Sequence, residues 1–357
     1  MKLLISLFLS ILFVLIGFSK PLNICIASRV GASLPAYKTA IYDAARLATE
    51  KYNIDVKLTP FFYKNPLDPI RVYDKMIEAK CDAVIGYEYL TDVCLLEKNR
   101  KINIPIFSLY GSNYKKSNIV NNIFFLLPSY YSQAKDMLGY MKSDLGLNNK
   151  SKILLLTNVS SESMKSYGKA YQHIFRKEQI NYKKIKFADE DKDIIYKALN
   201  ELKKDKYDFI IILSSSAQAS EIINGVDSNK YTYIGTDMFG SSVAPTLLYQ
   251  LKKTTNKIYF VRNIDTGFDK SVSLFNKEYC KEFNIDPLMI SLYAYDAVNV
   301  IIKSYSQFGF VAPRSIDGIN YDGVSGINIS KHKYNQSAHF IVLKVGKDGY
   351  EKKSISY

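Results

Sequence analysis

Residues 81–107 read CDAVIGYEYLTDVCLLEKNRKINIPIF. They contain two short apolar runs, Ala83-Val84-Ile85-Gly86 and Ile104-Pro105-Ile106-Phe107, separated by a segment with helical character from Thr91 to about Lys101. Buried strands of parallel sheets are short and almost continuously apolar, and a helix joins each strand to the next. These residues therefore predict a strand–helix–strand unit of a parallel sheet.

The same alternation continues on both sides of this unit. Upstream we expect a strand, a helix, a strand and a helix at residues 22–27, 35–52, 54–62 and 68–80. Downstream, helices and strands alternate again at residues 133–145 and 152–157, then in a helix that ends at residue 174, and at residues 182–187, 192–202, 209–213, 217–224 and 231–235. A strand at 257–261, helices at 272–282 and 291–305, and a strand-rich end at 323–345 follow. This order predicts an α/β protein with two doubly wound parallel-sheet lobes.

Composition narrows the class of protein. The chain has 357 residues, of which 47% are hydrophobic and 23% charged, and this excludes a disordered chain, a collagen-like repeat and a small disulfide scaffold. The formal net charge is +14. The lysines are scattered over predicted helix faces, as in ELKKDK at residues 201–206, so we expect no nucleic-acid partner.

The first nineteen residues have the three parts of a secretory signal peptide. Met1-Lys2 is basic, residues 3–16 are almost entirely apolar, and Gly17-Phe18-Ser19 precedes the expected cleavage site. The alternative is a membrane anchor, but the apolar run is near the lower length limit and no basic flank follows it at once. We therefore expect a soluble, exported protein. Its four cysteines would reach an oxidising compartment, and the sequence leaves their pairing open.

Short motifs along the mature chain carry a family resemblance. They are IASRVG at 26–31, CDAVIG at 81–86, IPIFS at 104–108, IGTD at 234–237, YAYDAV at 293–298 and YDGVSGI at 321–327. Because these motifs occur in this order along the sequence, the chain resembles the type I periplasmic binding proteins, specifically the branched-chain amino-acid and amide-binding (Leu/Ile/Val-binding-like) family. The resemblance covers about residues 22–349.

The resemblance implies two lobes joined by three hinge crossings, with a ligand enclosed between them. We place the crossings near Leu127, Val261 and Phe340. Lobe one would then hold residues 20–126 plus 262–339, and lobe two residues 127–261 plus 340–357. In such sheets ligands bind beyond the carboxyl ends of the strands.

Positions after strand ends in lobe one are the first candidate ligand contacts. Arg29 follows the first strand and could hold a ligand carboxylate with two hydrogen bonds; its alternative is a solvated loop arginine. Tyr87, Tyr89 and Thr91 lie where the family uses small residues and a helix N-terminus to hold a carboxylate. Thr91 has the alternative role of a helix cap. Two further candidates in the next turn are Tyr110 and Ser112.

Lobe two contributes three candidates. Ser161 and Ser215 lie in loops where the family places aromatic residues, and Asp237 lies where the family's acid accepts a ligand ammonium. The acidic run at 189–193 is interpreted as the start of a helix, where negative charge suits the helix dipole.

The sequence thus predicts the exported solute-binding protein of an ABC importer, with a small polar or amino-acid-like ligand, a membrane permease as partner and a monomeric state. We expect no cofactor, no metal and no catalysis, because the three histidines have no metal-ligand spacing and no nucleophile–base motif occurs. An alternative is a periplasmic sensor or scaffold of the same fold that reports to a membrane partner. A secreted α/β hydrolase is the weakest of the three hypotheses.

Overall fold

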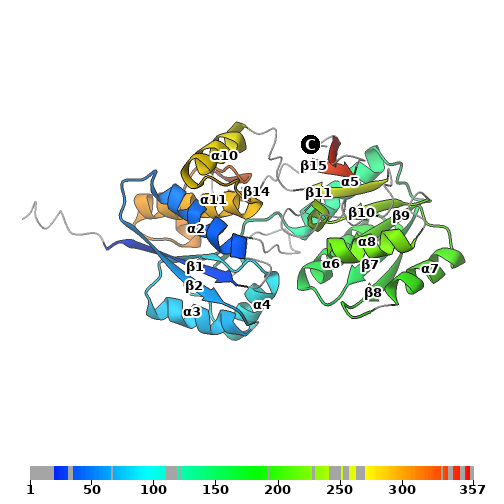
Figure 1. Cartoon of the computed structure of the whole chain (residues 1–357), viewed down its shortest axis with the longest axis horizontal. Coiled ribbons are helices and arrows are strands. Elements are labelled where there is room, and N and C mark those ends of the chain that lie inside the picture. Colours follow the sequence, from blue (N-terminus) through cyan, green and yellow to red (C-terminus); the bar gives the residue numbers. More distant parts are fainter. Residues whose placement is uncertain are drawn as a thin grey trace, which may run out of the picture.

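A computed structural model describes residues 20–30, 35–65, 67–109, 119–120, 122–191, 193–226, 230–240, 251, 257–262, 270–330, 333–336, 341–345 and 350–353. Figure 1 shows two lobes side by side. The expected signal peptide lies outside the described residues. Among the described helices, none has both the length and the apolar character needed to cross a membrane.

The first sheet has the strand order β2-β1-β3-β4-β6-β5, in which only β5 runs antiparallel to its neighbour. Its strands are β1 (Leu22–Arg29), β2 (Val56–Tyr63), β3 (Ala83–Gly86), β4 (Ile106–Ser108), β5 (Ile119–Val120) and β6 (Ile123–Phe125). Helices α3 (Asp68–Glu78) and α4 (Leu90–Asn99) cover one face. Helices α2 (Pro35–Thr49), α10 (Lys270–Phe283) and α11 (Met289–Phe308) cover the other (Figure 1). The late helices therefore pack on the sheet of the first lobe.

The second sheet has the order β16-β15-β11-β10-β9-β7-β8. Its strands are β7 (Lys152–Asn158), β8 (Asn181–Phe187), β9 (Phe209–Leu213), β10 (Thr232–Gly235), β11 (Ile258–Arg262), β15 (Ile341–Val345) and β16 (Tyr350–Lys353). Its helices are α5 (Tyr130–Ser143), α6 (Glu162–Lys177), α7 (Ile194–Lys204) and α8 (Ser216–Gly225). Strand β15 is antiparallel to β11 and joins the C-terminal end of the chain to this sheet. A separate small sheet holds β12 (Tyr321–Asp322), β13 (Ile327–Ser330) and β14 (Lys333–Gln336).

Strand periodicity explains how the second sheet is covered on both faces. Successive side chains of a strand point to opposite faces. Ile153 and Leu155 of β7 pack with α5 and α6, whereas Leu154 and Leu156 pack with α7 and α8. A strand that is buried on both faces has no polar alternation, which is why β7 reads as one apolar run.

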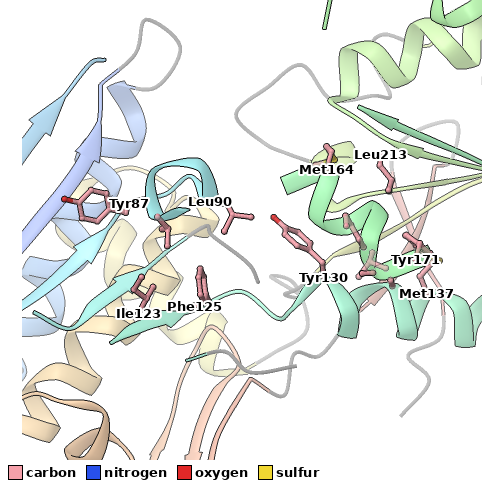
Figure 2. Close-up of a cluster of buried hydrophobic side chains, with 14 of the residues drawn as sticks. Tyr87, Leu90, Ile123, Phe125, Tyr130, Met137, Met164, Tyr171 and Leu213 are labelled. Carbon is pink, nitrogen blue, oxygen red and sulfur yellow. The ribbon is translucent and has the colours of Figure 1, made fainter. Parts of the chain in front are cut away.

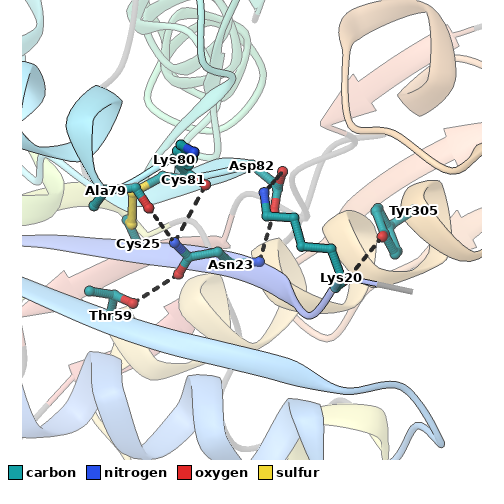
Figure 3. Close-up of polar contacts among 9 residues, drawn as sticks. All are labelled: Lys20, Asn23, Cys25, Thr59, Ala79, Lys80, Cys81, Asp82 and Tyr305. Carbon is teal, nitrogen blue, oxygen red and sulfur yellow. Dashed lines mark hydrogen bonds and ion pairs between the residues drawn. A yellow bond between two sulfur atoms is a disulfide. The ribbon is translucent and has the colours of Figure 1, made fainter. Parts of the chain in front are cut away.

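A disulfide joins the first and third strands of lobe one. Cys25 of β1 is bonded to Cys81, just before β3, with their Cα atoms 5.8 Å apart (Figure 3). The two strands are parallel neighbours in which Cys25 pairs with Val84, so the bond connects β1 to the residues that lead into β3. Close by, Asn23 donates its backbone N–H to Asp82 at 2.8 Å and its side-chain amide to the carbonyl of Ala79 at 3.0 Å. The remaining cysteines, Cys94 and Cys280, are free.

Two of the motifs that carry the resemblance meet in space. Asp296 of α11 is fully buried, and its carboxyl accepts from the Tyr321 hydroxyl at 2.5 Å and from the backbone N–H groups of Val324 at 3.1 Å and Ser325 at 2.6 Å. Burial raises the pKa of this carboxyl to about 6. A Cβ on Gly323 would lie 2.4 Å from its Oδ2 atom. The YDAV helix therefore holds the YDGVSG turn, and the turn needs a glycine.

Candidate functional site

The carboxyl ends of the two sheets lie toward one another. Helix α4 begins just beyond β3 and helix α6 just beyond β7, and these two helices contact each other across the lobes. Figure 2 shows Tyr130, at the start of α5, pointing from lobe two toward Leu90 of α4. Both residues belong to one buried apolar cluster with members in both lobes. The strand ends that sequence analysis selected therefore lie on the facing edges of the lobes.

In lobe one, β3 ends in a backbone turn that few residues adopt. Gly86 has φ +125°, and a Cβ there would lie 1.8 Å from the carbonyl oxygen of Ala27. Tyr87 follows with φ +47°, a left-handed conformation that is uncommon for an aromatic residue. Such conformations cluster at functional sites. The turn directs Glu88 toward β1 and places Tyr89 at the N-cap of α4.

Arg29 forms a buried ion pair at this edge. Its Nη2 lies 2.5 Å from Asp92 Oδ1, and the Tyr63 hydroxyl donates to Asp92 Oδ2 at 2.7 Å. The Asp92 side chain is fully buried and that of Arg29 is 22% exposed. The Arg29 guanidinium also lies 4.7 Å from the ring centre of Tyr89. The alternative of a solvated loop arginine is therefore wrong.

Glu88 is the most strongly perturbed acid at this edge. It is 4% exposed, and its carboxyl accepts from the Ser28 hydroxyl at 2.6 Å and from the backbone N–H of Arg29 at 3.4 Å. Burial raises its pKa to about 7, against the opposing effect of the hydrogen bond from Ser28. We call Ser28, Arg29, Tyr63, Glu88, Tyr89 and Asp92 the lobe-one cluster.

In lobe two, three successive strand ends contribute to one polar network. Asn158 ends β7, Asp189 follows β8, and Gln218 lies in the first turn of α8 after β9. Asp189 Oδ1 accepts from Asn158 Nδ2 at 2.6 Å and from Gln218 Nε2 at 3.0 Å. Asn158 Nδ2 also donates to Gln218 Oε1 at 2.7 Å. We call Asn158, Ser160, Asp189, Ser215 and Gln218 the lobe-two cluster.

Hydroxyl groups complete the surroundings of this network. Ser160 Oγ accepts from the Asp189 N–H at 3.0 Å. Ser161 and Ser215 are the N-caps of α6 and α8, and they accept from the N–H groups of Met164 and Gln218. Ser161 and Ser215 therefore each accept a hydrogen bond that caps a helix at the carboxyl edge of lobe two.

Asp237 opens a short 3-10 helix (Asp237–Gly240) immediately beyond β10. Burial first, and then the charge of Asp237 among other groups, raises the pKa values of Tyr130 and Tyr167. Asp237 therefore lies near the start of α5, where the chain enters lobe two.

The remaining candidate ligand contacts of lobe one lie in different places. Tyr87 is fully buried within lobe one, where its hydroxyl donates to the Pro69 carbonyl at 3.1 Å, so it does not face lobe two. Thr91 is exposed in the first turn of α4, and its alternative as the helix cap is wrong because the N-cap is Tyr89. Tyr110 and Ser112 lie outside the described residues.

Sequence reasoning missed one tyrosine, three acids and two amides that organise both edges: Tyr63, Glu88, Asp92, Asp189, Asn158 and Gln218. Asp189 was assigned to a helix start, but α7 begins only at Ile194. Tyr63, Glu88, Asn158 and Asp189 stand at or just beyond a predicted strand end, and Asp92 and Gln218 lie in the first turn of the helix that follows one; this position was the available signal. Within the described residues, no group of histidine, cysteine or acidic side chains forms a metal site.

Comparison with known proteins gives a consistent result. The family described as periplasmic binding protein matches residues 34–319. Among solved structures, a leucine-binding protein LivK from Thermotoga maritima is 15% identical, with a TM-score of 0.74 over 93% of this chain and 98% of that one. LivJ from Streptococcus pneumoniae in complex with isoleucine is 19% identical, with a TM-score of 0.70 over 93% and 98%.

Ligands differ among the similar structures. A solute-binding protein from R. palustris in complex with benzoate is 13% identical, with a TM-score of 0.71 over 93% of this chain and 95% of that one. No curated protein sequence matches this chain. At these identities the solved structures establish the fold, whose neighbours bind amino acids in some cases and an aromatic acid in another.

Proposed function

Because this chain belongs to the periplasmic binding protein family, with the type I fold, we propose that it is the solute-binding protein of an ABC importer. It captures a small polar or amino-acid-like ligand between its lobes in the periplasm and presents the closed form to a membrane permease. The observation that carries this proposal is the pair of facing carboxyl edges, each with its own polar cluster. No bond is made or broken in this cycle.

The connections between the lobes support a hinge. The first sheet ends at β6 and lobe two starts at α5; α10 returns to lobe one after β11; and β15 rejoins the second sheet after β14. We propose that the lobes rotate about these three connections, near Leu127, Val261 and Phe340. Closure of this kind is a common response of two-lobed binding proteins to ligand.

Helices α4 and α6 contact each other across the lobes. Tyr130 is buried, and its ring centre lies 5.1 Å from that of Tyr167. Since Leu90 and Tyr130 share one apolar cluster, the lobes remain in contact at this side while their outer parts move. An apolar contact tolerates small rotations better than a hydrogen-bonded one, because it has no strict directionality.

A ligand screen tests the proposal. The protein is unfolded and refolded to remove bound ligand, then heated with amino acids, amides, small carboxylates and purines. A ligand at about 100 times its dissociation constant adds about 2.7 kcal/mol of stability, which raises the melting temperature by several degrees. Small-angle scattering with the same compound should show a smaller radius of gyration. A compound that stabilises without compaction would contradict hinge closure, and no stabilisation by any compound would contradict capture of these ligands.

A further inference from the structure

Two acids of this chain lie at the N-terminus of α4. Helix N-termini beyond the carboxyl ends of parallel strands suit anionic ligand groups, because unpaired N–H groups and the helix dipole are directed there. Here Glu88 stands one residue before the N-cap and Asp92 lies in the first turn. Their exposed fractions are 4% and 0%. Two buried carboxyl groups of this chain therefore lie beside the N-terminus of α4, held there by Ser28, Arg29 and Tyr63.

The donors at the end of β1 are engaged as well. The Ser28 hydroxyl and the Arg29 N–H both bond to Glu88, each to a different carboxyl oxygen. A ligand carboxylate would have to displace this internal carboxyl from a buried position. Leaving a buried acid without its hydrogen bonds is costly, so such an exchange is unfavourable.

The one cation of the lobe-one cluster is neutralised within the cluster. Arg29 pairs with Asp92, which also accepts from Tyr63. When Glu88 is ionised, the cluster holds two negative charges and one positive charge. Its field therefore attracts a cation and repels a carboxylate, and both effects are strengthened by the low local dielectric.

Two other basic side chains among the described residues of this edge lie toward its outer strand. Lys64 and Arg71 line a hollow of about 350 Å³ at the end of β2, together with Tyr63 and Asp68. Arg71 pairs with Asp68 at 3.1 Å. Because β2 is the terminal strand of the sheet, these groups are displaced from the β1–β3 ends that carry Arg29 and Glu88.

Lobe two presents acceptors at its matching edge, where Lys165 in the first turn of α6 is already paired with Glu162 at 2.6 Å. Asp189 is held through Oδ1 by two side-chain amides, and its Oδ2 accepts no bond within the described residues. Asp237 adds a second carboxylate beyond β10. Asp189 and Asp237 thus place two carboxyl groups at the described edge of lobe two.

We propose that the site between the lobes selects a cationic amine that carries no carboxylate, with Glu88 as the residue that excludes the carboxylate. This inference rests on the proposed capture of a small ligand between the lobes. It separates this chain from a binder of free amino acids, because a zwitterion would place its carboxylate against one of the acidic edges. It also assigns Glu88 a role in specificity through its charge rather than through direct contact.

Matched probe pairs that differ by one carboxylate test the inference. The pairs are agmatine and arginine, putrescine and ornithine, and 3-methylbutylamine and leucine, measured by isothermal titration calorimetry. In the unmodified protein we expect at least one amine to bind about tenfold more tightly than its parent amino acid, since like charges brought close oppose binding. A parent amino acid that binds more tightly in each responding pair would overturn the inference and leave the proposed function intact.

Glu88→Gln tests the assigned residue. The amide keeps the size of the side chain and removes its charge, so we expect the preference for the amine to shrink about tenfold. Glu278→Gln is the control, because Glu278 of α10 forms an exposed ion pair with Lys51. An unchanged preference in folded Glu88→Gln protein would overturn the role of Glu88. If this variant does not fold, the ratio in the unmodified protein still decides the selectivity. No binding of any probe by any of the proteins would contradict both the inference and the capture of amino-acid-like ligands.

Discussion

The facing edges of the two lobes are built differently. In lobe one, a part-buried arginine pairs with one buried acid and a second buried acid bonds to its backbone, and a disulfide connects the neighbouring strands. In lobe two, one exposed aspartate is held by two amides, and the described strands there contain no disulfide. Lobe one therefore presents a fixed arrangement of charge, whereas lobe two presents a carboxylate with one oxygen available. A binding protein of this kind can set ligand charge in one lobe and adjust its contacts in the other.

The largest expected effect is on the disulfide of lobe one. Cys25 and Cys81 are 56 residues apart in sequence, so removing the bond frees a long loop in the unfolded chain. Replacing both cysteines by alanine should lower the stability of lobe one by about 4 kcal/mol. Hydrogen exchange should show the loss in β1 and β3 and little change in β7 and β9.

Reduction of the unmodified protein is the control. It should reproduce the same loss, while the double variant should not respond to reductant. Equal losses of protection in both lobes would show that the lobes unfold as one unit, and the contrast between a cross-linked and an uncross-linked lobe would then have no energetic meaning.

The second prediction concerns the buried pair of the lobe-one cluster. Asp92→Ala leaves Arg29 without its partner and the Tyr63 hydroxyl without its acceptor. Breaking a buried ion pair from one side costs about 3 kcal/mol, which urea denaturation can measure.

Asp74→Ala is the matched control for this prediction. Asp74 also pairs with an arginine, Arg100, through two hydrogen bonds of 2.7 and 2.8 Å, but at the surface. Exposed pairs contribute about 1 kcal/mol or less. Similar losses in the two variants would mean that the Arg29 pair is accessible to solvent in solution.

The sequence predicted the fold more fully than the site, and β3 shows why. The apolar run at residues 83–86 predicted the bounds of β3 directly. A strand that is buried on both faces is almost continuously apolar, so the sequence alone reveals it. The partners of the residues after it are not local. Arg29 and Asp92 are 63 positions apart and meet only because β1 and β3 are neighbours. The disulfide depends on the same adjacency, which is why its pairing stayed open.

The site predictions had a common weakness. They placed ligand contacts at strand ends, but a strand end does not reveal which way each side chain points. Tyr87 turns into the core because of its left-handed backbone, while its neighbour Glu88 turns toward β1. In lobe two, Asn158, Asp189 and Gln218 come from three separate strand ends, so no single motif contains them.

The third prediction concerns the adjustable carboxylate of lobe two. Asp189→Asn removes the charge but keeps a side-chain oxygen for Asn158 and Gln218. If Asp189 Oδ2 contacts a ligand amine, the affinity for the best amine probe should fall by about 1.5 kcal/mol, or roughly tenfold. Asp205→Asn is the control, because Asp205 pairs with Lys152 near the opposite ends of these strands. An equal fall in both variants would indicate a general effect of net charge rather than contact at Asp189.

The smallest expected effect is the pH dependence that lobe one gives to ligand affinity. The pKa of Glu88 is raised to about 7 mainly by burial, so this carboxyl gains its charge between pH 6 and pH 8. The charged and titratable groups around it are Arg29 of β1, Tyr63 of β2, Tyr87 at the end of β3, and Tyr89 and Asp92 of α4. An amine binds better to the ionised form, so its affinity should rise about threefold from pH 6 to pH 8. Glu88→Gln should remove the rise, whereas Asp189→Asn should keep it because Asp189 lies in the other lobe. A rise that persists in Glu88→Gln would show that another group titrates. Lobe one would then no longer be the lobe that sets the preferred ligand charge.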